Sequence, residues 1–275
     1  MTDKEILDRK HKVAIIVLSC DKYSDLWDPF FNLFFSNWPM CPYSVYLFSN
    51  EIDYKRKKVT TILSGKDFDW TRSVRKCIEQ ISCEYLFFFL EDAFIISKVD
   101  SIAVEEIVNN AILEDVNYVR LRPSPPPDRT YNDDYGLIAR DAMYRTSLFA
   151  SIWKRDVFLD ILQDGESAWA FEIQGTERSR KYNKFYSTWK NYFSYLHVVE
   201  NGCYISKSVN ILKAKGIILN TENRKLIHEW EYRFERYIAA SAKKTMAFLP
   251  RGLMLKIKNI AYRIFPLLKK FKKNI

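Results

Sequence analysis

The sequence predicts an α/β protein with a mostly parallel sheet flanked by helices. Three short apolar segments, at residues 12–18, 43–48 and 85–90, alternate with segments of helical periodicity. The third is apolar at six consecutive positions, which is typical of a strand buried on both faces in the middle of a parallel sheet. Strand, helix, strand order implies parallel neighbours joined by right-handed crossovers.

The remaining elements follow from apolar periodicity and from turn residues. Strands are predicted at residues 12–18, 43–48, 85–90, 118–121 and 144–152. Helices are predicted at residues 24–37, 69–81, 101–113 and 154–162, and a further short helix after residue 164. Ser24 can cap the first helix, and Pro39 stops it.

Two connections carry turn signals. The proline-rich run at 123–127 begins a polar loop that extends to about residue 140. This loop is either a binding loop or a surface loop without a binding role. Asn201-Gly202 is a strong turn dipeptide, which predicts a hairpin between residues 196–199 and 203–206.

Length and composition are those of a globular chain. With 275 residues, of which 48% are hydrophobic, it can bury a full core. Its five cysteines are odd in number and show no close pairing, which favours a reduced, cytosolic environment and argues against a zinc site. We expect neither a secretory signal nor a transmembrane helix, because the start is charged and no apolar run approaches about 20 residues.

The net charge of +9 is concentrated at one end of the chain. Residues 236–275 hold eleven Lys or Arg and no acid, whereas the first 235 residues hold 32 basic and 34 acidic side chains. The body therefore has no overall basic field, and we expect no nucleic-acid partner.

An acidic pair, Glu91 and Asp92, follows the central strand directly. In open α/β sheets, ligands gather at the carboxyl ends of the strands. Acids at that position are placed to handle a metal or a phosphate-bearing ligand. The structural alternative is that they only solvate the end of the strand.

This order of strands with polar exits, together with a helix that opens Asp69-Trp70-Thr71 and carries Arg75, resembles the nucleotide-sugar-binding half of GT-A (Rossmann-like) glycosyltransferases. The resemblance is strongest to bacterial enzymes that build capsule, O-antigen or other surface polysaccharides, and it covers about residues 12–215. It implies a transferase domain at 1–235, with a donor half at about 12–122 and an acceptor half at about 123–235.

The resemblance also implies which residues bind a nucleoside-diphosphate sugar. They are Ser19, Asp21, Tyr23, Asn50, Glu51, Asp69, Trp70, Arg75, Glu91 and Asp92. The family's Asp-x-Asp signature holds a divalent cation against the donor diphosphate, and here Glu91-Asp92 stands in its place with one acid displaced. Mg²⁺ or Mn²⁺ held by Asp92 and Glu91 is therefore expected, and a metal-independent variant that uses Arg or Lys stays open. His197 either completes the metal site or is a satisfied core histidine.

An inverting transferase also needs a base for the acceptor hydroxyl. In the resembled family that acid lies near the start of a helix beside a Trp, which points to Glu166 or Glu172. Residues six apart on a helix differ by roughly −120°, so only one of the two can be the base. We prefer Glu172, since its apolar neighbours would desolvate it. Trp169 and Arg178 would meet the acceptor. The structural alternatives are a helix cap for Glu166, an ion pair for Glu172 and a solvated turn for residues 175–180, which include Arg178.

Within residues 243–275, the segment expected to contact a membrane, apolar positions recur every three or four residues from Leu253, with basic residues on the opposite side. A basic amphipathic helix of this kind lies in the headgroup layer of anionic membranes. We expect residues 236–275 to form a membrane-associating tail, with packing on the body as the alternative. The protein would then be cytoplasmic and peripheral on the inner face of the cell membrane.

These features together predict an inverting glycosyltransferase that moves a sugar from a nucleoside-diphosphate donor to a growing lipid-linked surface-polysaccharide acceptor. Within the same fold, the alternatives are a retaining transferase and a nucleotidyltransferase. A different class is also open, a non-catalytic membrane adaptor with a degenerate transferase body.

Overall fold

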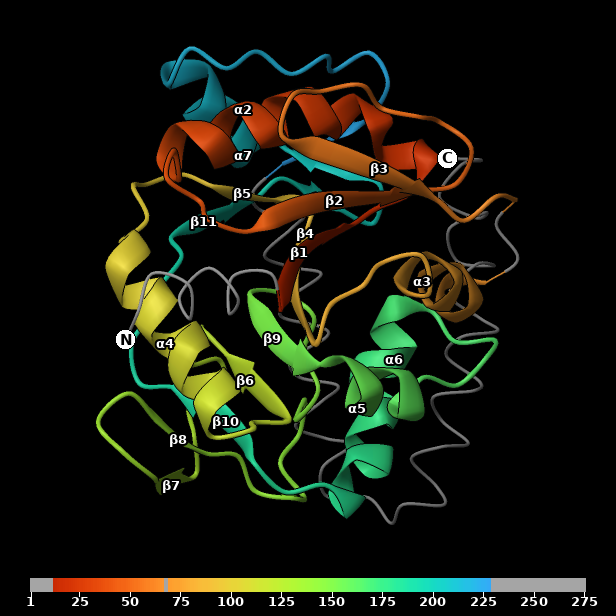
Figure 1. The fold of residues 1–275 in the computed structure, drawn as a ribbon. Helices are drawn as coiled ribbons and strands as arrows, with labels where there is room; N and C mark the ends of the chain where they lie inside the picture. The colour runs from red at the N-terminus through yellow and green to blue at the C-terminus, as the bar shows by residue number, and fades with distance from the viewer. Residues whose placement is uncertain (1–11, 67–68, 229–275) are drawn as a thin grey trace.

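A nine-stranded sheet forms the centre of the protein, with helices on both of its faces (Figure 1). The structure is a computed structural model that describes residues 12–66 and 69–228. The strand order in the large sheet is β3-β2-β1-β4-β9-β6-β10-β8-β7. Strands β11 and β5 form a second small sheet, and β12, β13 and β14 a third.

The strands are β1 (Val13–Leu18), β2 (Ser44–Ser49), β3 (Val59–Leu63), β4 (Tyr85–Leu90), β5 (Ala93–Ile95), β6 (Tyr118–Arg120), β7 (Arg129–Thr130), β8 (Tyr135–Leu137), β9 (Ser151–Lys154), β10 (Phe185–Thr188), β11 (Tyr195–His197), β12 (Val199–Glu200), β13 (Cys203–Ile205) and β14 (Leu226–Ile227). The helices are η1 (Asp21–Leu26), α2 (Trp27–Asn37), α3 (Trp70–Ile78), α4 (Ser101–Leu113), α5 (Arg155–Ile161), α6 (Ala168–Arg178), η2 (Ser179–Lys181) and α7 (Ser206–Ala214).

The large sheet is mostly parallel, as the sequence predicts. β3, β2, β1 and β4 pair in parallel, and β6 and β10 run in the same direction. β9 is antiparallel to both of its neighbours, β4 and β6, and β8 is antiparallel to β10 and β7. The α/β class with a mostly parallel sheet flanked by helices is therefore confirmed.

The central strand β4 explains why both faces of the sheet are covered. Phe87 and Phe89 belong to one apolar core, with residues of α2, α4 and α7, whereas Leu86 and Phe88 belong to the other, with residues of α3, α5 and α6. Figure 1 shows α2 and α7 together on one side and α3, α5 and α6 grouped on the other. A strand that is apolar at every position requires this arrangement, because successive side chains point to opposite faces.

Polar residues fix the starts of three helices. The side chains of Asp69, Asp100 and Ser167 accept hydrogen bonds from backbone N–H groups in the first turns of α3, α4 and α6 respectively. These caps satisfy donors that have no partner inside the helix. Asp69 and Ser167 thereby set the positions of two helices that border the candidate site.

The strand predicted at residues 144–152 is wrong over most of its length. Only Ser151–Lys154 forms strand β9, and the residues before it make turns in which Tyr144 and Ala150 have φ of 55° and 48°. Leu148 and Phe149 are buried by packing without belonging to a strand. Their apolar character therefore reports burial and not strand pairing.

Other local predictions also change. Ser24 lies inside η1 and does not cap the first helix, which begins at Trp27. The loop predicted to extend to about residue 140 contains the edge hairpin of β7 and β8. Strand β3 and helix α7 were not predicted. The turn at Asn201-Gly202 is confirmed, because it joins β12 to β13 and both residues have positive φ.

The membrane-associating tail predicted at 236–275 lies outside the described residues, and the division into a body and a tail stays a prediction. Across residues 12–66 and 69–228, no helix is both long enough and apolar enough to cross a bilayer.

Candidate functional site

The exits of four strands lie at one edge of the large sheet. β1 is parallel to β2 and to β4, with Leu18 opposite Leu90. β6 ends at the same edge, because Arg120 pairs with Ser151 and Ser151 in turn pairs with Phe88 of β4. The predicted grouping of the first, second and central strand exits is confirmed, and the end of β6 joins them.

Asp21 and Asn50 join the exit loops of β1 and β2 to each other. The Asp21 carboxylate accepts hydrogen bonds from the backbone N–H groups of Asn50 and Glu51, both at 3.0 Å, and Asn50 Oδ1 accepts one from Asp21 N at 3.1 Å. Two residues predicted to contact the donor thus also build the loops. Glu51 contributes its backbone N–H, and its side chain is exposed.

Glu91, which is buried, and Asp92, which is half-buried, are adjacent acids at the end of β4. Glu91 is 8% exposed, and burial together with the neighbouring Asp92 raises its pKa well above the usual value. Burial also raises the pKa of Asp92, whose Oδ1 is buried without a hydrogen-bond partner. Two adjacent acids, one buried and one half-buried, are costly to ionise, so the site favours a cation or a proton between them.

Ser19 and Tyr23, from the exit of β1, lie beside this pair. Ser19 accepts a hydrogen bond from Trp27 Nε1 at 2.8 Å and lies within hydrogen-bonding reach of Glu91. The pKa of Tyr23 is raised by burial and by the charges of Glu91 and Asp92. The structure therefore brings these four predicted residues together.

His197 is placed against Asp92 by the pairing of β11 with β5. His197 is opposite Ala93, and its Nδ1 lies 3.7 Å from Asp92 Oδ2. On the other side of the ring, Nε2 lies 3.3 Å from Glu200 Oε2. The His197 side chain is about a third exposed and lies between two carboxylates, which fits a metal ligand as well as the alternative of a satisfied histidine.

The donor set fits a divalent cation in part. Asp92 offers a buried carboxylate oxygen with no partner, and His197 offers an imidazole, both of which are ligands that such cations accept. However, in the part of the chain that the structure describes, no group of three or more His, Cys, Asp or Glu side chains could hold a metal ion. Substrate oxygens would have to complete the coordination.

A pocket of about 540 Å³ opens beside the exit of β1. Its lining consists of Lys22, Tyr23, Ser24, Asp25, Asn201, Gly202, Asn223 and Arg224. The Arg224 guanidinium forms two hydrogen bonds to the Asp25 carboxylate, at 2.8 and 2.7 Å, and lies 4.4 Å from the centre of the Tyr23 ring. Although burial raises the pKa of Asp25, hydrogen bonds from Arg224 and Tyr204 bring it below the usual value. The charges of Arg224 and Asp25 in the pocket lining therefore neutralise each other.

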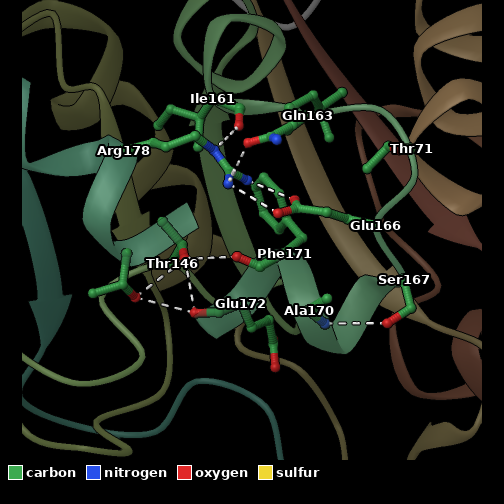
Figure 2. A network of polar contacts seen from close by, with 12 residues as sticks. Thr71, Thr146, Ile161, Gln163, Glu166, Ser167, Ala170, Phe171, Glu172 and Arg178 are labelled. Carbon is green, nitrogen blue, oxygen red and sulfur yellow. Dashed lines mark hydrogen bonds and ion pairs between the residues drawn. The ribbon is translucent and has the colours of Figure 1, made fainter. Parts of the chain in front are cut away.

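Glu166 forms an ion pair with Arg178. Arg178 donates two hydrogen bonds to the Glu166 carboxylate, at 2.9 and 2.6 Å, and Glu166 is only 7% exposed (Figure 2). A third Arg178 hydrogen bond reaches Ile161 O at 2.6 Å. Glu166, the second choice for the base, is thus paired with Arg178, which was predicted to contact the acceptor.

The offset of roughly −120° predicted between Glu166 and Glu172 does not apply, because Glu166 lies before the first residue of α6. Glu172 lies on the helix itself. Figure 2 shows its carboxylate pointing away from the pair formed by Glu166 and Arg178. Glu172 Oε1 accepts hydrogen bonds from Leu148 N at 2.9 Å and from Ser147 Oγ at 3.3 Å. Burial raises its pKa, and these hydrogen bonds oppose the rise. A positioned carboxylate with a raised pKa is suited to proton transfer.

Arg120 and Arg122, which the sequence analysis missed, lie near Glu172 and lower its pKa. The Arg122 guanidinium packs 4.8 Å from the centre of the Tyr195 ring. Tyr195 and His197 are alternate residues of β11, so they share a face at a separation of roughly 7 Å. Arg122 therefore lies between the Glu172 side of the site and Asp92.

The remaining predicted residues lie at the contact of α3 with α5 and α6. The Trp70 ring is 5.7 Å from that of Phe171, and Arg75 donates hydrogen bonds to backbone carbonyls at the end of α5, those of Leu159 and Leu162. Asp69 caps α3, as described above. Trp169 is 51% exposed on α6. Trp70 and Arg75 thus hold α3 against α5 and α6, and the contact of these four residues with a substrate stays a prediction.

The sequence carried a signal for Arg122 but none for Arg120 or Arg224. Arg120 and Arg122 sit in the short segment Arg-Leu-Arg-Pro at the end of a predicted strand, and Arg224 lies in a polar stretch without periodicity. A polar side chain at a strand exit was the signal used for β1, β2 and β4. Applied equally to the strand at 118–121, the same criterion would have found Arg122.

Comparison with known proteins gives weak likenesses only. No protein family model matches the sequence, and no curated protein matches it. Among solved structures, the chain is similar to S. aureus TarS 1-349 in complex with UDP, with 12% identity and a TM-score of 0.48 over 66% of this chain and 59% of that one. The chain thus spans about three fifths of that structure's length.

The chain is also similar to two further solved structures. One is the mannosyltransferase PcManGT from Pyrobaculum calidifontis in complex with GDP-Man and Mn²⁺, with 10% identity and a TM-score of 0.43 over 70% of this chain and 58% of that one. The other is glucosyl-3-phosphoglycerate synthase from Mycobacterium tuberculosis with Mn²⁺ and UDP-Glc, with 10% identity and a TM-score of 0.45 over 79% and 84% of the two chains. Likenesses of this size carry no argument about function, which has to come from the site.

Proposed function

We propose that the protein is an inverting glycosyltransferase that moves a sugar from a nucleoside-diphosphate donor to an acceptor hydroxyl. The observation that carries the proposal is the placement of Glu91 and Asp92 at the end of β4 and of Arg120 and Arg122 at the end of β6, at one edge of one sheet. Only β9 separates these two strands, so their ends lie about 10 Å apart. Glu172 of α6 lies near these arginines, whose charges oppose the rise that burial causes in its pKa.

On the donor side, the acid pair and the exit of β1 would bind the diphosphate. Asp92, with its partnerless Oδ1, and His197 are the residues that would hold Mg²⁺ or Mn²⁺. When bound, such an ion neutralises the charge on the departing diphosphate. Glu91 is buried next to Asp92, and a cation bound there would offset the repulsion that raises its pKa.

On the acceptor side, Glu172 would act as the base. Leu148 N and Ser147 Oγ hold its Oε1, which fixes the direction of the carboxylate. The acceptor hydroxyl gives its proton to Glu172 while its oxygen forms a bond to the anomeric carbon of the donor sugar. The bond from that carbon to the diphosphate oxygen breaks, and the nucleoside diphosphate leaves with the electron pair. A single displacement of this kind inverts the configuration at the anomeric carbon.

The acceptor proposed from the sequence is a lipid-linked saccharide of a surface polysaccharide, such as capsule or O-antigen, at the inner face of the cell membrane. Its support is the basic amphipathic pattern of residues 243–275. Co-sedimentation with vesicles tests this part: the full chain should bind vesicles rich in anionic lipid. Replacing Lys269, Lys270, Lys272 and Lys273 by Glu should abolish binding, because each basic residue near the surface contributes about 1 kcal/mol.

Release of nucleoside diphosphate tests the catalytic proposal. The protein is incubated with uridine- and guanosine-diphosphate sugars and Mn²⁺, and release is followed for the native chain and for Asp92→Asn and Glu172→Gln. Both variants should lose turnover while they keep the native fold, whereas Glu177→Gln, an exposed position on the same helix, should not. Unchanged turnover in both site variants would overturn the roles assigned to Asp92 and Glu172, and absence of turnover in the native chain would favour the adaptor. Release of pyrophosphate would indicate a nucleotidyltransferase, and retained anomeric configuration a retaining enzyme.

A further inference from the structure

Arg120 is a buried cation that the protein itself leaves incompletely bonded. The residue is 1% exposed, and its Nη1 donates a hydrogen bond to Tyr144 O at 2.9 Å. Its Nε and Nη2 are buried and have no hydrogen-bond partner. Burying charged donors without acceptors is costly, so an acceptor supplied by a ligand would be strongly favoured there.

The strands beside Arg120 leave room for its side chain. Ser151 of β9 and Ser187 of β10 are its partners in the sheet, and both are fully buried. Small side chains at these positions let the guanidinium lie over the sheet, whereas larger ones would displace it. The position is therefore built to hold an arginine at the end of β6.

Arg122 presents a second guanidinium two residues further on. Its Cζ lies over the Tyr195 ring, 4.8 Å from the ring centre, and its hydrogen bond to Ser124 Oγ is long, 3.5 Å. Stacking on an aromatic ring orients a guanidinium while its N–H groups stay available for an anion. Burial lowers the pKa of Arg120, and the nearby charge of Arg122 lowers it further. An anion between the two would relieve that repulsion.

We propose that Arg120 and Arg122 form a subsite for a phosphate group at the exit of β6, between the acid pair and Glu172. Two planar guanidinium groups suit phosphate, because each donates paired N–H groups to its oxygens. The assignment of that phosphate to a substrate rests on the proposed function. It belongs either to the diphosphate of the donor or to a phosphate-bearing acceptor, whereas the binding of phosphate itself does not depend on catalysis.

Inorganic phosphate is the first probe. Thermal unfolding of the full chain is measured with increasing sodium phosphate at constant ionic strength, for the native protein, Arg122→Gln and the control Arg129→Gln, an exposed arginine at the sheet edge. Phosphate should raise the melting temperature of the native protein and of the control but not that of Arg122→Gln. An equal rise in all three, or no rise in the native protein, would overturn the proposal.

Arg120→Gln serves as a second variant, because the native position is buried. Its circular dichroism spectrum and its melting temperature without phosphate show whether it folds. If it folds, it should also lose the effect of phosphate, and an unchanged effect would remove Arg120 from the subsite. If it does not fold, the result for Arg122→Gln decides the proposal alone, because Arg122 is only partly buried.

UDP, GDP and the corresponding monophosphates identify the source of the phosphate. If it is the donor diphosphate, Arg122→Gln should weaken diphosphate binding about tenfold and leave monophosphate binding unchanged. If it is the acceptor, nucleotide binding should be unchanged while the effect of inorganic phosphate is lost. A native protein that binds phosphate at Arg122 but turns over no nucleotide sugar would contradict the proposed function and leave the subsite standing.

Discussion

His197 Nδ1 lies 3.7 Å from Asp92 Oδ2, although the two residues come from distant parts of the chain. The contact exists because β11 adds to β5, the short strand that begins immediately after Asp92, and places His197 opposite Ala93. A backbone hydrogen bond from Val198 N to Asp92 O, 2.9 Å long, continues this pairing. The imidazole and the carboxylate are therefore fixed by the backbone and not by their own attraction.

Both side chains should be needed for binding of a divalent cation. We expect Mn²⁺ to raise the melting temperature of the native chain and EDTA to reverse the rise. His197→Ala and Asp92→Asn should each weaken the apparent affinity at least about tenfold, because each removes one of two protein ligands. His228→Ala is the matched control, since His228 lies away from β4 and lines a separate pocket with residues of α7. An unchanged Mn²⁺ response in both site variants would remove the metal from the proposal.

Replacing Glu91 by Gln should stabilise the protein more at pH 8 than at pH 5. Burial and the neighbouring Asp92 raise the pKa of Glu91, so the folded state binds this proton more tightly than the unfolded state. Its contribution to stability is complete below the unfolded pKa and is lost as the pH rises through the folded value. Gln keeps the shape but does not ionise. Calorimetric melting temperatures of both proteins at the two pH values test this.

The control for Glu91 is Glu79→Gln, an exposed acid at the end of α3. Its melting temperature relative to the native protein should not depend on pH in this range. A difference between Glu91→Gln and the native protein that is the same at pH 5 and pH 8 would mean that Glu91 has no raised pKa in the folded chain.

The parts of the fold that the sequence predicts are those determined by local burial. β1, β2 and β4 are buried in a parallel sheet, so their apolar runs identify them, and their common direction follows from the intervening helices. β3 was missed because its residues are half-exposed and follow a run of charges. Leu148 and Phe149 misled the prediction because turns can be buried as fully as strands.

The parts of the site that the sequence did not predict depend on partners that only the folded chain brings together. Glu166 and Arg178 were each assigned a separate role, and the structure joins them in one ion pair. Asp21 and Asn50 were expected to contact the donor, and the structure uses them to join two loops. A residue type at a strand exit predicts nearness to a site, whereas its hydrogen-bond partners decide what it does there.

The pair formed by Glu166 and Arg178 should contribute to stability and not to proton transfer. The side chains of Glu166 and Arg178 are both largely buried. Removing either one therefore leaves the other as a buried charge without a partner of opposite sign. A double-mutant cycle with Glu166→Gln and Arg178→Met, followed by urea unfolding, should give a coupling energy of about 0.5–3 kcal/mol. Glu166→Gln should keep native turnover at a temperature where it is folded. A turnover loss there, with the fold intact, would make Glu166 the base.

Glu172→Gln should lower turnover by roughly 10²- to 10⁴-fold and change the KM for the donor little, because a base acts on the acceptor hydroxyl in the transition state. The native enzyme should lose activity on the acid side at a higher pH than an ordinary glutamate would dictate, since burial raises the Glu172 pKa and the base must be ionised to accept a proton. Ser147→Ala removes one hydrogen bond that favours the ionised form, so the acid limb should move to still higher pH. In this variant the Leu148 N–H still holds Glu172 Oε1, so the pH profile should shift while the maximal rate changes little. If the profile of Ser147→Ala coincides with that of the native protein while Glu172→Gln remains active, the base must lie elsewhere on the edge that β4 and β6 share.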